Sequence, residues 1–283
     1  MVSFCKHIVI VAVLALSITS ASAQVFTPGQ YKDGIYEKEN TVNRKFIPYT
    51  YLREGDVQWS KRVWREIDMR EKINHPLYYP IEPINGRTSL FQLLSKSILN
   101  QEIIAFGDEE FLKPLELAEV KKKLMSCDSV AESSVADDGT EVVTSVWKCD
   151  STSIFKNIRK YRLKEDWFFD KQKSVMEVRI IGICPITFIT KDDVDYDVEM
   201  FWVYFPECRY KFSENEVYNT KNDAERRSFD DLFWKRQFNS NVVKESNVYE
   251  RGMGEYAKGI DALLENERVK KEIFQYEHDF WQF

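Results

Sequence analysis

The sequence predicts an α+β fold, in which a central antiparallel β block is flanked by N-terminal and C-terminal helices and preceded by an extended N-terminal arm. Runs rich in β-branched and aromatic residues gather between residues 130 and 205, and helical apolar spacing lies on both sides of them. Strands in one block favour α+β over a wound βαβ sheet. We assign residues 1–23 to a signal peptide, 24–55 to the arm and 56–283 to a single α+β domain.

Residues 1–23 have the pattern of a secretory signal peptide. Lys6 lies in a short n-region of residues 1–7, residues 8–18 form an apolar core, and Ala21, Ser22 and Ala23 are small residues suited to cleavage. The core is shorter than the roughly 20 apolar residues that span a bilayer. No cysteine follows the cleavage site, so we expect a soluble mature chain across the inner membrane, attached to any membrane only through a partner.

The composition and charge of the chain argue against a nucleic-acid-binding protein and against a disordered one. Removing 23 of the 283 residues leaves 260, which is ample for a hydrophobic core. The loss of Lys6 leaves 39 basic against 46 acidic side chains, a net charge of −7, which argues against a nucleic-acid partner. A hydrophobic content of 43% excludes wholesale disorder.

The arm combines turn signals with aromatic residues. Five of the eight prolines precede Ile84, and Pro28-Gly29 and Asp33-Gly34 indicate turns. Its apolar character predicts packing on its own domain or on a neighbouring subunit, and the former is the commoner outcome. The aromatic residues of the arm are Tyr31, Tyr36, Phe46, Tyr49 and Tyr51.

Two helices are expected before the β block. Asp56 can cap the first, which carries Trp59, Val63 and Ile67 at i, i+4 and i+8, although the later part of this run fits a strand equally. The second begins at Thr88 or Ser89, where Ser89 and Gln92 form a capping box, and extends to Ile103 and Ile104. Lys121, Lys122 and Lys123 are interpreted as a solvated face.

The β block begins with a hairpin. Residues 130–135 and 141–147 flank Asp137-Asp138-Gly139, a strong turn signal. Three further strand-like runs follow at residues 166–170, 175–184 and 198–205, and Pro185 and Pro206 are expected to end the last two.

Helical character returns from Asn222, with Asp223 near the start, and a final helix is expected over residues 254–280. Its two apolar stripes lie about 180° apart. Either the helix breaks at residues 265–267 and both stripes face one core, or it continues and offers the second stripe to another subunit; we favour the break. The first stripe is Met253, Tyr256, Ala257, Ile260, Leu263 and Leu264; the second, our interface candidate, is Val269, Ile273, Tyr276 and Phe280.

From the sequence we predict no catalytic, cofactor-binding or metal-binding residue. The mature chain holds only His75 and His278, neither in a recognised catalytic spacing. Gly252, Gly254 and Gly259 depart from the dinucleotide fingerprint, because the third glycine comes two places late and no strand precedes them.

Alternating acidic residues raise one further possibility. Asp193, Asp195 and Asp197 resemble the start of a calcium loop, but Val198 replaces its glycine and Tyr204 its bidentate glutamate. We interpret residues 192–199 as a solvated acidic loop, with opportunistic calcium binding as the alternative.

The cysteines predict one disulfide. Cys127 and Cys149 each lie 11 residues from Asp138, so a hairpin about that turn places them opposite one another. Cys184 and Cys208 are expected to remain thiols, because pairing of the strands at 175–184 and 198–205 separates them by about 10 residues at about 3.4 Å each.

Several long strings of residues are shared with a known family. From Asp56 onward the chain resembles the GldN/PorN family, the periplasmic component of the type IX secretion and gliding motility machinery of certain gram-negative bacteria. The strings are residues 64–74, 76–80, 165–170, 179–183 and 201–209, and, within the densest stretch from 222 to 283, residues 228–233 and 244–249.

The resemblance implies a non-enzymatic assembly subunit without a cofactor. It implies a ring formed with an outer-membrane lipoprotein of the GldK/PorK type, in contact with an inner-membrane motor complex of GldL and GldM. The protein would then lie in the periplasm, peripherally associated with the outer membrane. The alternatives from other classes are a cell-envelope hydrolase and a small-ligand or calcium-binding module.

Overall fold

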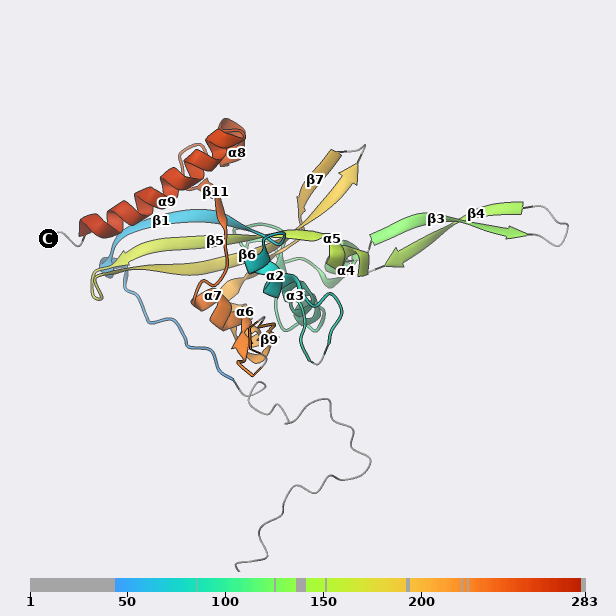
Figure 1. Ribbon diagram of the computed structural model, residues 1–283, viewed down its shortest axis with the longest axis horizontal. Helices are drawn as coiled ribbons and strands as arrows, with labels where there is room; N and C mark the ends of the chain where they lie inside the picture. The colour runs from blue at the N-terminus through green and yellow to red at the C-terminus, as the bar shows by residue number, and fades with distance from the viewer. Residues whose placement is uncertain are drawn as a thin grey trace, which may run out of the picture. The chain divides into compact units, whose positions relative to one another are not determined.

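An antiparallel sheet organises the computed structural model, which describes residues 44–280 except 85, 125, 136–140, 151, 192–193, 220 and 223. Its strand order is β11-β1-β5-β6-β8-β2, and β7 pairs with β6 (Figure 1). The combination of this antiparallel sheet with helices confirms the α+β class. The strands are β1 (Val57–Asp68), β2 (Ala105–Phe106), β5 (Ile158–Asp170), β6 (Val175–Lys191), β7 (Val194–Glu199), β8 (Trp202–Tyr204) and β11 (Asn241–Glu245).

The first predicted helix is in fact strand β1. Trp59, Val63 and Ile67 are four residues apart, and four is a multiple of the strand period of two as well as close to the helical 3.6. All three therefore point to one side of the strand. Val63 and Ile67 are fully buried there, whereas only the 3-10 helix η1 (Glu54–Asp56) precedes the strand.

The second predicted helix is confirmed at its start and corrected at its end. In α3 (Leu90–Leu99) the Ser89 side chain accepts from the Gln92 backbone N–H, and the Gln92 side chain accepts from the Ser89 N–H. The helix ends at Leu99, with Asn100 as its C-cap, because Gln101 adopts a positive φ of 60°. The neighbouring helices are η2 (Lys72–Asn74), α2 (His75–Tyr78), α4 (Leu117–Lys123) and α5 (Thr152–Asn157).

The predicted hairpin is present as β3 (Ser126–Val135) and β4 (Glu141–Asp150), which pair in a two-stranded sheet. Its turn lies outside the described residues. Pro185 does not end β6: it lies opposite Tyr161 of β5, where the other edge of β6 passes from β8 to β7. Its missing N–H is tolerated at that junction, and its carbonyl accepts from Met200 N at 3.1 Å. Pro206 does follow the end of β8, inside the first turn of α6 (Phe205–Glu214).

The C-terminal helical regions differ from the prediction in their bounds. Helix α7 (Phe229–Trp234) is capped by Ser228, and Asp223 lies outside the described residues. The last helical region is split into α8 (Met253–Tyr256) and α9 (Ile260–Phe280) by Gly259, which has a positive φ of 60°. Short strands β9 (Glu216–Val217) and β10 (Arg227–Ser228) precede α7.

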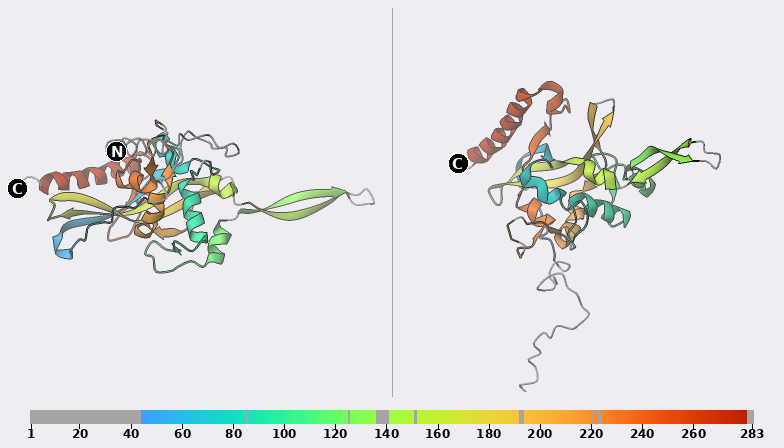
Figure 2. Two further views of the ribbon diagram at one scale, coloured as in Figure 1. Left: turned by 90° about the horizontal axis from the view of Figure 1, so that it is seen from below. Right: turned by 45° about the vertical axis from the view of Figure 1, so that its right-hand side comes forward.

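Two main clusters of buried side chains pack against the long strands of the sheet. The larger cluster packs Ile67, Tyr161 and Leu163 of the sheet against α3, α6 and α7. The second packs Val63 and Val242 of the sheet against α9, which lies along β11 and β1 (Figure 2). A third, smaller cluster holds Trp64, Cys184 and Trp202. Strand β1 therefore contributes to all three.

The described part of the arm, residues 44–53, packs on the chain's own body. Arg44 pairs with Asp231 of α7 at 2.6 Å, and the Tyr49 ring stacks on Trp234 at a centroid distance of 5.5 Å. The signal peptide and residues 24–43 lie outside the described part of the chain. The domain boundary at Asp56 stays a prediction.

Candidate functional site

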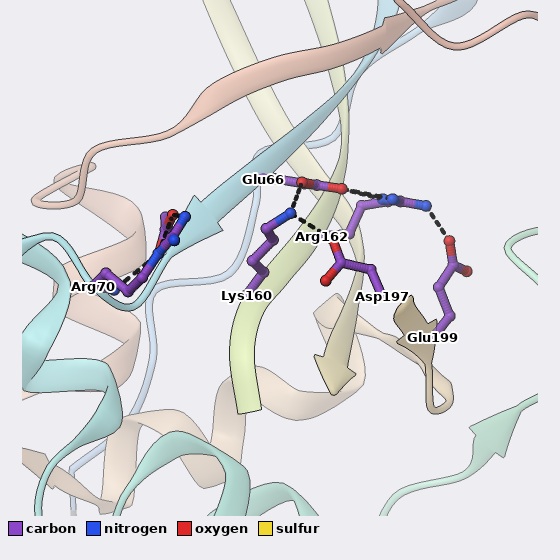
Figure 3. Close-up of polar contacts among 7 residues, drawn as sticks. Glu66, Arg70, Lys160, Arg162, Asp197 and Glu199 are labelled. Atoms are coloured by element: carbon purple, nitrogen blue, oxygen red, sulfur yellow. Dashed lines mark hydrogen bonds and ion pairs between the residues drawn. The ribbon is translucent and has the colours of Figure 1, made fainter. Parts of the chain in front are cut away.

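A chain of alternating charges crosses three strands of the sheet (Figure 3). Arg162 of β5 lies opposite Glu66 of β1 in the strand register and donates to it across 2.5 Å. The same guanidinium also pairs with Glu199 of β7. Lys160 joins Glu66 at 3.5 Å to Asp197 of β7 at 2.6 Å. These contacts tie β7, whose strand partner is β6, to the central strands.

The electrostatics of this charge ladder fit a structural role. Burial alone would lower the pKa of Lys160, but its bonds to Asp197 and Glu66 outweigh burial and raise that pKa. The carboxylates of Asp197 and Glu199 stay 46% and 42% exposed, and exposed pairs each contribute only about 0.2–1 kcal/mol to stability. The ladder therefore orients β7 more than it stabilises the fold.

A cavity of about 550 Å³ opens beside the ladder. Trp64 forms part of its wall, and the indole N–H donates to Glu109 at 2.6 Å while the Lys244 ammonium lies 4.4 Å from the ring centroid. Carboxylates outnumber cations in the lining, which favours contact with a basic segment of a partner. The charged lining residues are Glu66, Asp108, Glu109, Glu199, Glu250 and Glu255 against Arg162 and Lys244.

Three carboxyl groups of the described residues have clearly shifted pKa values. Among the described residues, those carboxyl groups with a clear shift, Asp68, Glu225 and Glu265, have a lowered pKa because each accepts from an arginine side chain. A general acid at neutral pH needs the opposite shift. His75 packs edge-on against Tyr79, and His278 is exposed beside Asp279.

The expected acidic loop is corrected in part. Residues Val194–Glu199 form strand β7, and Asp197 is held by Lys160, while Asp193 lies outside the described residues. The backbone of such a strand is extended, so it does not wrap around a point as a calcium loop does. Within the described part of the chain, no group of three His, Cys, Asp or Glu side chains is placed to hold a metal ion.

The two stripes of the last helix have opposite environments. Helix α9 runs through residues 265–267 without a break. Within this stretch Asn266 faces inward, and its side chain accepts from the Val242 N–H at 2.8 Å. Val269 and Ile273 are buried beneath it, Tyr276 packs on Trp59, and Phe280 stacks on Phe169. The proposed interface stripe is thus the inner face of the helix within its own chain.

The other stripe is exposed. Ile260, Leu263 and Leu264 are 75%, 60% and 63% exposed, and Phe274, on the same side of α9 about three to four turns later, is 67% exposed. Met253 and Ala257 of this stripe are buried, because they lie before the turn at Gly259. Clustered large apolar side chains in water are typical of protein contact sites. We call Ile260, Leu263, Leu264 and Phe274 the outer stripe.

Comparison with known protein families identifies the family of this chain. Residues 52–282 match the family described as gliding motility associated protein GldN. The chain belongs to the GldN family. GldN proteins are components of the gliding motility machinery, associated with type IX secretion, and are not a known enzyme family. No curated protein matches the sequence. None of the helices in the described part of this GldN-family chain is long and apolar enough to cross a membrane.

The register of β3 and β4 places Cys127 of this GldN-family chain directly opposite Cys149. That juxtaposition is the one a bridge requires, and the bond itself stays a prediction. Cys184 and Cys208 are free and buried, and burial raises the pKa of both thiols. A raised pKa disfavours the reactive thiolate.

We expect Cys149→Ser to lower the melting temperature of the oxidised protein without preventing folding. A bridge that closes a loop of this size stabilises by about 3 kcal/mol in the chain-entropy model, a modest part of the stability of a chain with its own large core. Peptide mapping without reductant should recover Cys127 linked to Cys149. A link between Cys184 and Cys208 would contradict both the expected connectivity and the strand pairing.

Two features of this GldN protein escaped the sequence analysis. The charge ladder has a visible signal, since Lys160, Arg162 and Lys164 alternate along β5 and so share one side of the strand. The buried pair of Arg209 and Asp230 has none, because its members come from two helices joined only by the tertiary fold.

Proposed function

We propose that this chain is a non-enzymatic periplasmic scaffold subunit of the type IX secretion and gliding motility machinery. It forms a ring with an outer-membrane lipoprotein of the GldK/PorK type and contacts an inner-membrane motor of the GldL/GldM type. The family match over residues 52–282 is the observation that carries the proposal. The signal-peptide pattern of residues 1–23 supports the periplasmic location.

The exposed surfaces support a role in assembly. A scaffold works by burying surface against other subunits, and the outer stripe of α9 offers apolar area that the chain itself leaves in water. We therefore assign the subunit contact to the outer stripe. The acidic cavity beside Trp64 supplies a second, charged surface.

Membrane attachment through a partner is the direct test. The mature protein should fractionate with the outer membrane when the lipoprotein is present, and should move to the soluble periplasmic fraction when it is deleted, because no lipid-accepting cysteine follows the expected cleavage site. Immunoblots of separated fractions measure this, with the lipoprotein restored from a plasmid as the control. Persistent membrane association of the isolated mature chain would overturn the proposal.

A further inference from the structure

A cavity of about 330 Å³ lies where the arm crosses the sheet and two helices. Arm residues 47–50 form one wall, and β6, α6 and α7 form the others. The size is at the lower end of that for small-molecule sites. The side chains that decide its chemistry are Tyr49, Arg179, Arg209, Asp230, Trp234 and Arg236.

Arg209 brings a buried cation to this cavity. Arg209 is only 1% exposed, and its Nε and Nη2 atoms donate to Asp230 at 2.8 and 3.1 Å. Its guanidinium also lies 4.4 Å from the Tyr49 ring centroid and 4.9 Å from that of Trp234. The third nitrogen, Nη1, is buried and has no hydrogen-bond partner among the described residues.

Arg179 gives the cavity a positive charge that no carboxylate balances among the described residues. Its Nη2 donates to the Thr50 carbonyl at 2.7 Å, but within the described part of the chain no carboxylate pairs with it. Its Nε is also buried and without a partner there. The other cations of the lining are matched, since Lys173 pairs with Glu177 and Arg236 with Glu165.

A buried N–H group without a partner costs free energy that a suitable acceptor recovers. Here two arginines that line one cavity each hold such a group, and one positive charge is left over. One excess charge suits a monoanion better than a dianion such as phosphate. The aromatic rings of Tyr49 and Trp234 suit an apolar body attached to that anion.

We propose that this cavity binds a carboxylate with a small apolar body. The carboxylate pairs with Arg179 on the side of the cavity that Arg209 also lines, while the apolar body lies against the aromatic wall. Free small carboxylates and the C-terminal carboxylate of a peptide share this chemistry. The site goes beyond the scaffold role, and it should be functional in the isolated protein whether or not a ring forms.

Titration of the whole mature chain with matched probes tests the site. The probes are 3-phenylpropionate and its uncharged amide, and the tripeptide Ala-Ala-Phe with a free or an amidated C-terminus. Calorimetry gives the affinity, and the side-chain N–H signals of arginine in NMR spectra locate the contact. We expect each acid to bind at least about tenfold more tightly than its amide, with shifts at Arg179 and Arg209. Comparing the two acids identifies the source of the carboxylate.

Variants separate the pocket from general charge effects. Arg179→Gln should weaken acid binding by about tenfold or more, and Arg179→Lys should restore part of it, because lysine keeps the charge but not the Nε donor. Arg70→Gln removes an exposed arginine that pairs with Asp68 outside this cavity, and it should leave binding unchanged. Equal affinity for acid and amide, no binding of either acid, or equal losses in Arg179→Gln and Arg70→Gln would each overturn the proposal.

Discussion

Replacing Arg236 with Met should lower the free energy of unfolding by about 3–5 kcal/mol, because it leaves a carboxylate buried without its cation. Glu165 is fully buried, and the Arg236 guanidinium donates to both of its oxygens at 2.9 and 3.1 Å. Trp167 donates to the same carboxylate at 3.1 Å, which does not neutralise it. Methionine retains part of the arginine's packing on Trp167, so the loss reports mainly on charge.

Urea denaturation of three variants isolates this effect. The double variant Glu165→Leu with Arg236→Met should recover most of the lost stability, because apolar residues of similar size replace a buried pair at little cost. Arg70→Met removes an exposed arginine, 72% accessible in its pair with Asp68, and should change stability little. If Arg236→Met and Arg70→Met cost the same, Glu165 is not the buried charge that its contacts indicate.

Local patterns predicted those parts of the fold that depend on neighbouring residues. The capping box of Ser89 and Gln92 spans four residues, and the register of Cys127 with Cys149 follows from equal distances to one turn. The run that forms strand β1 was predicted as a helix, with a strand left open for its later part, because a spacing of four fits a helix and a strand alike. The choice between them came from pairing with β5 and β11, which lie about 100 and 180 residues away in sequence.

The candidate sites could be predicted less well, for a physical reason. Both stripes of α9 are apolar, so periodicity cannot say which one faces the sheet. The orientation follows from Asn266, whose side chain bonds to the backbone of β11 and so fixes the inner face. Buried charges present the same difficulty, since an arginine such as Arg209 or a glutamate such as Glu165 is usually exposed, and each is buried here beside a partner, Asp230 or Arg236, that only the tertiary fold supplies.

Opposite faces of α9 should therefore give opposite phenotypes. Leu263→Glu combined with Leu264→Glu should abolish incorporation into the membrane complex while leaving the unfolding curve of the isolated protein almost unchanged, because both side chains are at least 60% exposed. Ile273→Ala, on the inner face, should instead cost about 2–5 kcal/mol of stability, because it empties space between the helix and the sheet.

Charge alone must be controlled for, since the double variant adds two negative charges. Lys121→Glu changes the net charge equally at an exposed position of α4, and it should assemble normally. Co-purification from detergent-solubilised membranes measures incorporation, and urea denaturation of the purified chain measures stability. Normal assembly of the Leu263→Glu, Leu264→Glu chain would show that the outer stripe is not a subunit contact. If the Lys121→Glu chain also fails to assemble, the added negative charge explains the loss. If only the Leu263→Glu, Leu264→Glu chain fails and its stability is unchanged, the cause is the loss of apolar burial against a neighbouring subunit.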